Sequence, residues 1–234
     1  MTQSNTIYLV RHGENPANIT HDFSYKKVDL SLTPKGILQA QQTGDYFRDR
    51  NIHEIYASPL KRAIETANFI ARPLDLAVTI MEQFREINVG DLEGMPPTKE
   101  NWAWHDRITD AWLAGEHTVP FPGGEDYNSL LHRLRDGLAT ITANKTGKNI
   151  VVVGHGGIFT RTIQDICPNV DMQEVLSKPN YNCAIIEIEL TTNGTYVAGV
   201  LKQWASHSHL HGEAADLVSG TLLAQPLVVK EQPV

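Results

Sequence analysis

The chain has 234 residues, of which 41% are hydrophobic and 20% are charged. This composition is ordinary for a globular protein and excludes disordered, collagen-like and coiled-coil classes for the chain as a whole. The formal net charge of −7 argues against nucleic acid or an anionic membrane as a partner, because both require a broad basic face. We expect a cytoplasmic protein, because the sequence shows no signal peptide and no membrane-spanning run, and its two cysteines lack disulfide or metal-ligand spacing.

The first predicted element is a short apolar strand over residues 7–10, which runs directly into Arg11-His12-Gly13-Glu14. A short apolar run bounded by a turn is typical of a strand that is buried on both faces of a parallel sheet. Ligands bind such sheets in the crevice outside the carboxyl ends of the strands. The pattern therefore places Arg11 and His12 at a ligand site.

The next stretch, residues 15–30, is polar and irregular, and it predicts a loop that borders this site. Thr33 and Pro34 then form a helix start, with threonine as the N-cap and proline at the first helical position. The apolar spacing over 37–47 is that of one helix face, and a short strand over 54–57 comes next.

Ser58-Pro59 repeats the pattern of a cap followed by proline and predicts the start of another helix. Arg62 then falls in the first turn of that helix, just beyond the carboxyl end of the strand over 54–57. The alternation of strand and helix with short connections is the signature of a parallel α/β sheet.

The middle of the chain contains an insertion and then a second turn like the first. Residues 78–81 are a weaker strand, and the prolines and three tryptophans between 95 and 124 indicate a helical cap. A helix from about 125 to 143 leads to an apolar strand over 149–154. That strand runs into His155-Gly156-Gly157, so two turns of the same design can meet across one sheet.

After a helix over 158–166, the stretches 184–190 and 196–203 flank Asn193-Gly194 and predict an antiparallel hairpin at the sheet edge. The predicted fold is a three-layer α/β/α domain, with a mostly parallel central sheet, one antiparallel edge strand and a helical cap insertion. We assign residues 1–205 to this single domain, with the cap at about 95–124, and residues 206–234 to a C-terminal tail.

Alternating histidines in the tail, His207, His209 and His211, raise the question of a metal site. No cysteine, aspartate or glutamate completes a recognisable ligand set, so we predict a solvated strand or loop here. The apolar run over 217–229 is expected to pack on the domain or on a second copy of the chain.

Arg11, Arg62 and the two histidines would form a pocket in which like positive charges repel one another when no ligand is bound. A phosphate dianion would neutralise these charges. The backbone N–H of Gly156 is a further donor. A neutral His12 could attack phosphorus and form a phosphohistidine. The leaving alcohol then needs a proton from a carboxyl group, and Glu86 and Glu93 both qualify by residue type.

Four motifs of the chain resemble those of the histidine phosphatase superfamily, also called the phosphoglycerate mutase-like family, in the order typical of that family. The resemblance spans about residues 6–190, and its motifs are Arg11-His12-Gly13-Glu14, Ser58-Pro59-Leu60-Lys61-Arg62-Ala63, the stretch 85–94 and Gly154-His155-Gly156-Gly157. It implies a phosphorylated nucleophile, a phosphate pocket with an added donor, and a general acid. These roles fall, in that order, on His12, on Arg11, Arg62 and His155 with Asn18, and on Glu86.

We therefore predict a metal-independent phosphomonoesterase of the histidine acid phosphatase type, with no cofactor. Its substrate would be a small soluble phosphate ester of the sugar phosphate or phosphoglycerate type. One alternative is a cofactor-dependent phosphoglycerate mutase. The mutases of the family that this chain resembles carry the sequence Glu-Arg-His-Tyr-Gly, whereas this chain has Glu86-Ile87-Asn88-Val89-Gly90 at that place. The other is a catalytically silent phosphate-binding protein. The edge hairpin and the apolar tail are candidate contacts of a homodimer.

Overall fold

One six-stranded sheet forms the centre of the computed structural model, which describes residues 3–194 and 196–218. The strands follow the spatial order β3-β2-β4-β1-β5-β6. Their bounds are β1 (Gln3–Arg11), β2 (Glu54–Ala57), β3 (Val78–Ile80), β4 (Asn149–Gly154), β5 (Ile185–Asn193) and β6 (Tyr196–Ser206). The first four strands of the spatial order pair in parallel, and the hairpin β5–β6 adds the antiparallel edge. The predicted fold class is confirmed.

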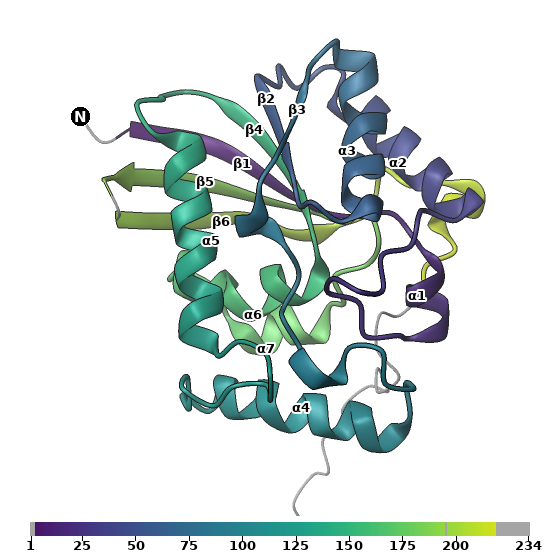
Figure 1. Ribbon diagram of the computed structural model, residues 1–234. Coiled ribbons are helices and arrows are strands. Elements are labelled where there is room, and N and C mark those ends of the chain that lie inside the picture. Colours follow the sequence, from purple (N-terminus) through teal and green to yellow (C-terminus); the bar gives the residue numbers. More distant parts are fainter. Residues whose placement is uncertain (1–2, 195, 219–234) are drawn as a thin grey trace, which may run out of the picture.

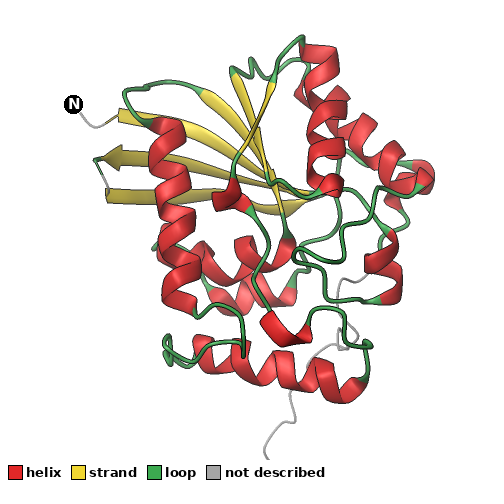
Figure 2. Ribbon diagram, in the orientation of Figure 1, coloured by secondary structure: helices red, strands yellow, loops and turns green. Residues whose placement is uncertain are grey.

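Helices cover both faces of this sheet. Their bounds are α1 (Pro16–Thr20), α2 (Pro34–Phe47), α3 (Lys61–Ala71), α4 (Lys99–Leu113), α5 (Tyr127–Thr142), α6 (Gly156–Ile166) and α7 (Met172–Ser177). Figures 1 and 2 show α2 and α3 on one side of the sheet and α5 and α6 on the other, with α4 apart from both layers. None of the helices described here is long and apolar enough to cross a membrane.

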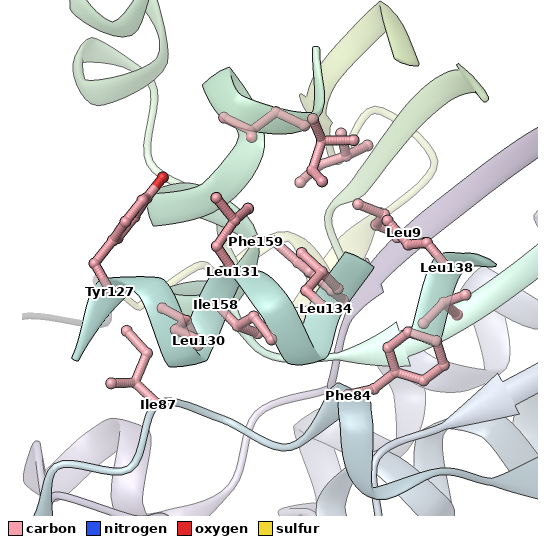
Figure 3. Packing of buried hydrophobic residues seen from close by; sticks show 14 of the residues in the cluster. Leu9, Phe84, Ile87, Tyr127, Leu130, Leu131, Leu134, Leu138, Ile158 and Phe159 are labelled. Carbon is pink, nitrogen blue, oxygen red and sulfur yellow. The ribbon is translucent and has the colours of Figure 1, made fainter. Parts of the chain in front are cut away.

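The alternation of side chains along β1 explains the three layers. Ile7 and Leu9 join a hydrophobic cluster with residues of α5 and α6, whereas Tyr8 and Val10 join a second cluster that includes Phe47 of α2. Ile7, Tyr8, Leu9 and Val10 are each at most 7% exposed, as expected for a strand that is buried on both faces. Figure 3 shows the first cluster around Leu9, Phe84, Ile87, Tyr127, Leu130, Leu131, Leu134, Leu138, Ile158 and Phe159.

Two predictions that concern helix starts were wrong. The stretch 15–30 is not irregular throughout, because Asn15 caps α1 and Pro16 occupies its first position. Conversely, Ser58-Pro59 does not cap α3, which begins at Lys61. The hydroxyl of Ser58 instead forms a hydrogen bond with Nε2 of His155, which lies far away in the sequence. This tertiary contact uses the hydroxyl that was expected to cap the helix.

The tail histidines differ in their surroundings. His207 and His211 lie in an exposed loop after β6, as predicted, but His209 is half-buried and its Nε2 lies 3.0 Å from Oγ1 of Thr43. The solvated state predicted for His209 was therefore wrong, because its ring packs beside α2. Within the described ranges, no group of three or more histidine, cysteine, aspartate or glutamate residues could hold a metal ion. Most of the predicted apolar run, from residue 219 onward, lies outside those ranges.

Candidate active site

Parallel pairing brings the two His-Gly turns together. Arg11 lies opposite Gly154 in the register of β1 and β4, so His12 and His155 follow at the same edge of the sheet. Their ring centroids are 5.2 Å apart, and the two residues are only 3% and 0% exposed. The chain thus places two buried imidazoles face to edge at the carboxyl ends of adjacent strands.

The tautomer of His12 follows from its hydrogen bonds. Its Nδ1 lies 2.7 Å from the carbonyl oxygen of Gly13, which can only accept, so Nδ1 carries the hydrogen. The Nε2 atom accepts a hydrogen bond from Nε of Arg62 at 3.0 Å and therefore holds a lone pair. Burial, followed by the charge of Arg62, holds the pKa of His12 well below the usual 6.5. His12 is a neutral imidazole with an available nitrogen.

Arg62 is fixed by the loop that precedes α2. Its Nη1 and Nη2 donate to the hydroxyl and the carbonyl of Ser24, at 2.8 and 2.9 Å. Burial lowers the pKa of Arg62 to about 10, so the guanidinium remains charged at neutral pH. One side chain thus contacts the nucleophile candidate and the neighbouring loop together.

Arg11 and His155 each carry a buried nitrogen atom that is unpaired within the described residues. Nη1 of Arg11 donates to the carbonyl of Asn180, but its buried Nε is unpaired within the described chain. Nε2 of His155 lies 2.7 Å from the hydroxyl of Ser58, and its buried Nδ1 is likewise unpaired there. Burial, then Arg62, keeps the pKa of His155 well below 6.5. Buried polar groups rarely lack partners, so these atoms indicate a polar ligand.

Asn18 lies beside this pocket at the third position of α1. Its Oδ1 accepts hydrogen bonds from the backbone N–H of Asn15 at 3.1 Å and from Nδ2 of Asn182 at 3.0 Å. The amide group is thereby oriented, and its NH₂ is left without a partner in the part of the chain that the structure describes. Asn18 is therefore held as an oriented donor.

Asn182 was missed by the sequence analysis. Its Nδ2 donates to the carbonyl of His12 at 3.0 Å as well as to Asn18. It lies in the loop before β5, and only the antiparallel pairing of β5 with β1 brings that loop to the site. No spacing in the sequence signals this neighbour.

The side chain of Glu86 binds the amino terminus of α6. Its carboxylate oxygens accept from the backbone N–H groups of Gly157 at 3.0 Å and Ile158 at 2.8 Å, which the helix leaves unpaired. A Cβ at Gly157 would lie 2.7 Å from Oε1 of Glu86, so a larger residue here would displace this carboxylate. Gly156, the first residue of α6, lies against Arg11 in turn.

Glu93, the other candidate carboxylate, has a different environment. Its Oε1 accepts from four consecutive backbone N–H groups, those of residues 25–28, at distances that include 2.8, 2.7 and 3.2 Å. These residues follow Ser24, which holds Arg62. Glu93 therefore fixes a loop, whereas Glu86 lies at the turn of His155.

Arg133 on α5 was also missed. Its Nη1 donates to the carbonyls of Gln83 and Arg85 at 2.9 and 2.7 Å, and Nη2 donates to that of Glu86 at 2.9 Å. Its guanidinium also pairs with Glu125 at 2.8 Å. Arg133 thus holds the backbone that carries Glu86, a role that an isolated arginine in a helical pattern does not reveal.

The family model of the histidine phosphatase superfamily (branch 1) matches residues 7–202. The chain belongs to this superfamily. The chain is 31% identical over 206 residues to the uncharacterized phosphatase PhoE of Bacillus subtilis (strain 168), a match that covers 88% of this chain and 97% of PhoE. It is 30% identical over 217 residues to a protein of Salmonella choleraesuis (strain SC-B67) named "Probable phosphoglycerate mutase GpmB", with coverage of 90% and 97%.

A solved structure gives the same answer for the fold. A phosphoserine phosphatase variant from Entamoeba histolytica, in complex with phosphoserine, matches with a TM-score of 0.71 and 28% identity, over 88% of this chain and 100% of that chain. The resemblance inferred from the four motifs is therefore confirmed. The family and its phosphatase relatives support a phosphatase enzyme.

The lowered pKa of His12 makes a prediction for activity if His12 is the nucleophile. A histidine nucleophile works when neutral, and it loses activity as the pH falls through its pKa in the folded free enzyme. We expect the acidic limb of kcat/KM to lie well below pH 6.5, because burial and Arg62 disfavour the imidazolium. The measurement is kcat/KM for an aryl phosphate from pH 4 to 8, divided by the fraction of substrate present as dianion. A limb centred near 6.5 would contradict this environment for His12.

Proposed function

We propose that the protein is a metal-independent phosphomonoesterase that hydrolyses a small phosphate ester through a phosphohistidine at His12. The observation that carries this proposal is the neutral His12, whose Nε2 lone pair faces Arg62 among buried cationic and unpaired donors. A phosphate dianion would satisfy those donors and neutralise the two guanidinium charges.

In the proposed pocket, Arg11, Arg62 and His155 hold the non-bridging phosphate oxygens. The NH₂ group of Asn18 and the backbone N–H of Gly156 are further donors. A phosphate oxygen is a stronger acceptor than a neutral imidazole, so the Nε–H of Arg62 passes from His12 to the substrate. That exchange frees the Nε2 lone pair for attack.

The reaction then proceeds in two displacements. Nε2 of His12 forms a bond to phosphorus while the bond from phosphorus to the alcohol oxygen breaks, and Glu86 gives that oxygen its proton. Water next attacks the phosphohistidine, Glu86 takes a proton from the water, and phosphate leaves with His12 restored.

A phosphoglycerate mutase is the second candidate, and the relation to the GpmB protein favours it. A mutase must return the phosphoryl group from histidine to a bound product before water reacts. The two functions are separated by supplying 3-phosphoglycerate with its bisphosphate primer. A phosphatase releases inorganic phosphate, whereas a mutase moves the phosphoryl group between carbons.

The proposed substrate class is a small phosphorylated metabolite of the sugar phosphate or phosphoglycerate type. The phosphoserine bound to the Entamoeba histolytica enzyme supports adding phosphoserine to a panel of such esters. The panel is compared by kcat/KM, because that ratio measures discrimination between substrates.

Activity is expected to survive removal of divalent ions. Arg11 and Arg62 supply the positive charge that a bound metal supplies in other phosphatases, so EDTA should change the hydrolysis of an aryl phosphate by less than about twofold. A zinc-dependent phosphatase assayed in parallel shows that the chelator works. Loss of turnover that a divalent ion restores would overturn the proposed mechanism.

A further inference from the structure

Beyond β6, the chain crosses α2 as a segment of residues 207–217, which we call the strap. The family model ends at residue 202, before the strap begins. Figure 1 shows this yellow segment beside α2. Leu210 and Ala214 of the strap are 7% and 1% exposed and form a small cluster with Ala40 and Cys183.

One set of contacts joins the strap to the turn that carries His12. Gln39 of α2 is 1% exposed, and its Oε1 accepts from the backbone N–H of Glu14 at 2.9 Å while its Nε2 donates to the carbonyl of Ala214 at 3.1 Å. Lys35 repeats the bridge, because its Nζ lies 2.7 Å from the Glu14 carboxylate and 2.9 Å from the carbonyl of Asp216. Two side chains of α2 thus tie the strap to Glu14.

A second set of contacts reaches the opposite side of the pocket. The ring of His207 packs on Tyr181 with centroids 5.4 Å apart, and Leu210 packs in the cluster that contains Cys183. The backbone N–H of Cys183 donates to the carbonyl of Arg11 at 3.0 Å. The loop over residues 180–183 that the strap covers also holds the Arg11 guanidinium and, through Asn182, the carbonyl of His12.

We propose that the strap is a positioning element of the active site, which holds the His12 turn and the 180–183 loop in the geometry required for attack on phosphorus. This inference rests on the proposed function. In-line attack depends on the placement of one nitrogen to within a fraction of an ångström. Among the phosphate donors, Arg11 and Asn18 contact the 180–183 loop, whereas Arg62 is held by Ser24 and Gly156 begins α6. Loosening the strap therefore lowers kcat more than it raises KM.

The first test compares Leu210→Ala with Leu190→Ala in the full chain. Both changes remove the same atoms from a buried leucine, but Leu190 lies opposite Asn5, at the other end of the sheet from the pocket. With both variants assayed well below their Tm, Leu210→Ala is expected to lower kcat by about tenfold with KM changed less than about twofold. Leu190→Ala should lower Tm but leave kcat within about twofold. Equal kcat values in the two variants overturn the proposal.

A milder variant covers the case in which Leu210→Ala does not fold. Gln42 exchanges two hydrogen bonds with the backbone of His211, at 2.8 and 3.2 Å, and contributes nothing to the buried core. Gln42→Ala should lower kcat about twofold to threefold with an unchanged KM, since it weakens only the strap. No effect on kcat counts against the strap.

Hydrogen exchange separates the failure of this inference from the failure of the proposed function. The amides of Glu14 and Cys183 should exchange faster in Leu210→Ala than in Leu190→Ala, relative to the amides of β4. A wild-type protein with no activity on any ester refutes the proposed function, and the exchange rates then decide on the strap. Unchanged exchange at both amides refutes the strap in either case.

Discussion

Replacing His12 with alanine is expected to abolish turnover, with kcat reduced by about 10⁴-fold or more, as for the removal of a nucleophile in other enzymes with covalent intermediates. The expectation follows from the Nε2 lone pair, which accepts from Arg62 in a pocket where His155 lies beside the His12 ring, with centroids 5.2 Å apart. His155 does not present its Nε2 in the same way, because that atom lies 2.7 Å from the hydroxyl of Ser58. The measurement is the hydrolysis of an aryl phosphate in the presence of EDTA.

The matched control is His53→Ala. His53 lies at the amino end of the sheet, where its Nδ1 accepts from the backbone N–H of Asn149 at 3.1 Å, so its loss should leave kcat unchanged. Rapid acid quenching after mixing with labelled ester should trap a phosphoenzyme in the wild type and in His53→Ala, but not in His12→Ala. Turnover by His12→Ala at the rate of the control would refute the phosphohistidine. A wild type that binds phosphate but never becomes labelled would favour the silent binding protein.

The sequence predicted those parts of the fold that depend on local pattern. The apolar run before Arg11 and the matching run before His155 identified two neighbouring buried strands, and parallel pairing then required their turns to meet. Thr33 and Pro34 also marked a true helix start. These elements follow from the spacing of residues along the chain, so no knowledge of distant contacts is needed to find them.

Roles that depend on distant contacts could not be predicted in the same way. Ser58 has the residue type and position of a cap, yet its hydroxyl is bonded to His155, 97 positions away. The family resemblance implied a role for Glu86, whereas residue type alone did not separate it from Glu93. The structure shows that the carboxylate of Glu86 accepts from the amino terminus of α6, whereas that of Glu93 accepts from the loop of residues 25–28. Arg133 donates hydrogen bonds to backbone carbonyls. Because every residue has a carbonyl, the sequence does not show which ones an arginine will bind.

Glu86→Gln is the second substitution with a large expected effect, and the size of that effect should depend on the leaving group. A general acid matters most when the departing alkoxide is strongly basic, as in an alkyl phosphate, and least for an aryl phosphate that leaves as a stable phenolate. We expect kcat to fall by about 10²–10⁴-fold for an alkyl ester and far less for a nitrophenyl ester. Glutamine still offers an oxygen to the N–H of Ile158, so any loosening of α6 should affect both esters alike.

Glu93→Gln is the control that resolves the choice between the two carboxylates. Its Oε1 holds the loop of residues 25–28, so substitution disturbs the position of Ser24 and hence Arg62. That disturbance should slow the alkyl and aryl esters by the same factor, because it changes phosphate positioning and not proton transfer. A leaving-group dependence in Glu93→Gln and none in Glu86→Gln would show that Glu93, and not Glu86, donates the proton. Our mechanism would then name the wrong carboxylate. The ratio of the two esters therefore tests the acid independently of how much either variant loses in total activity.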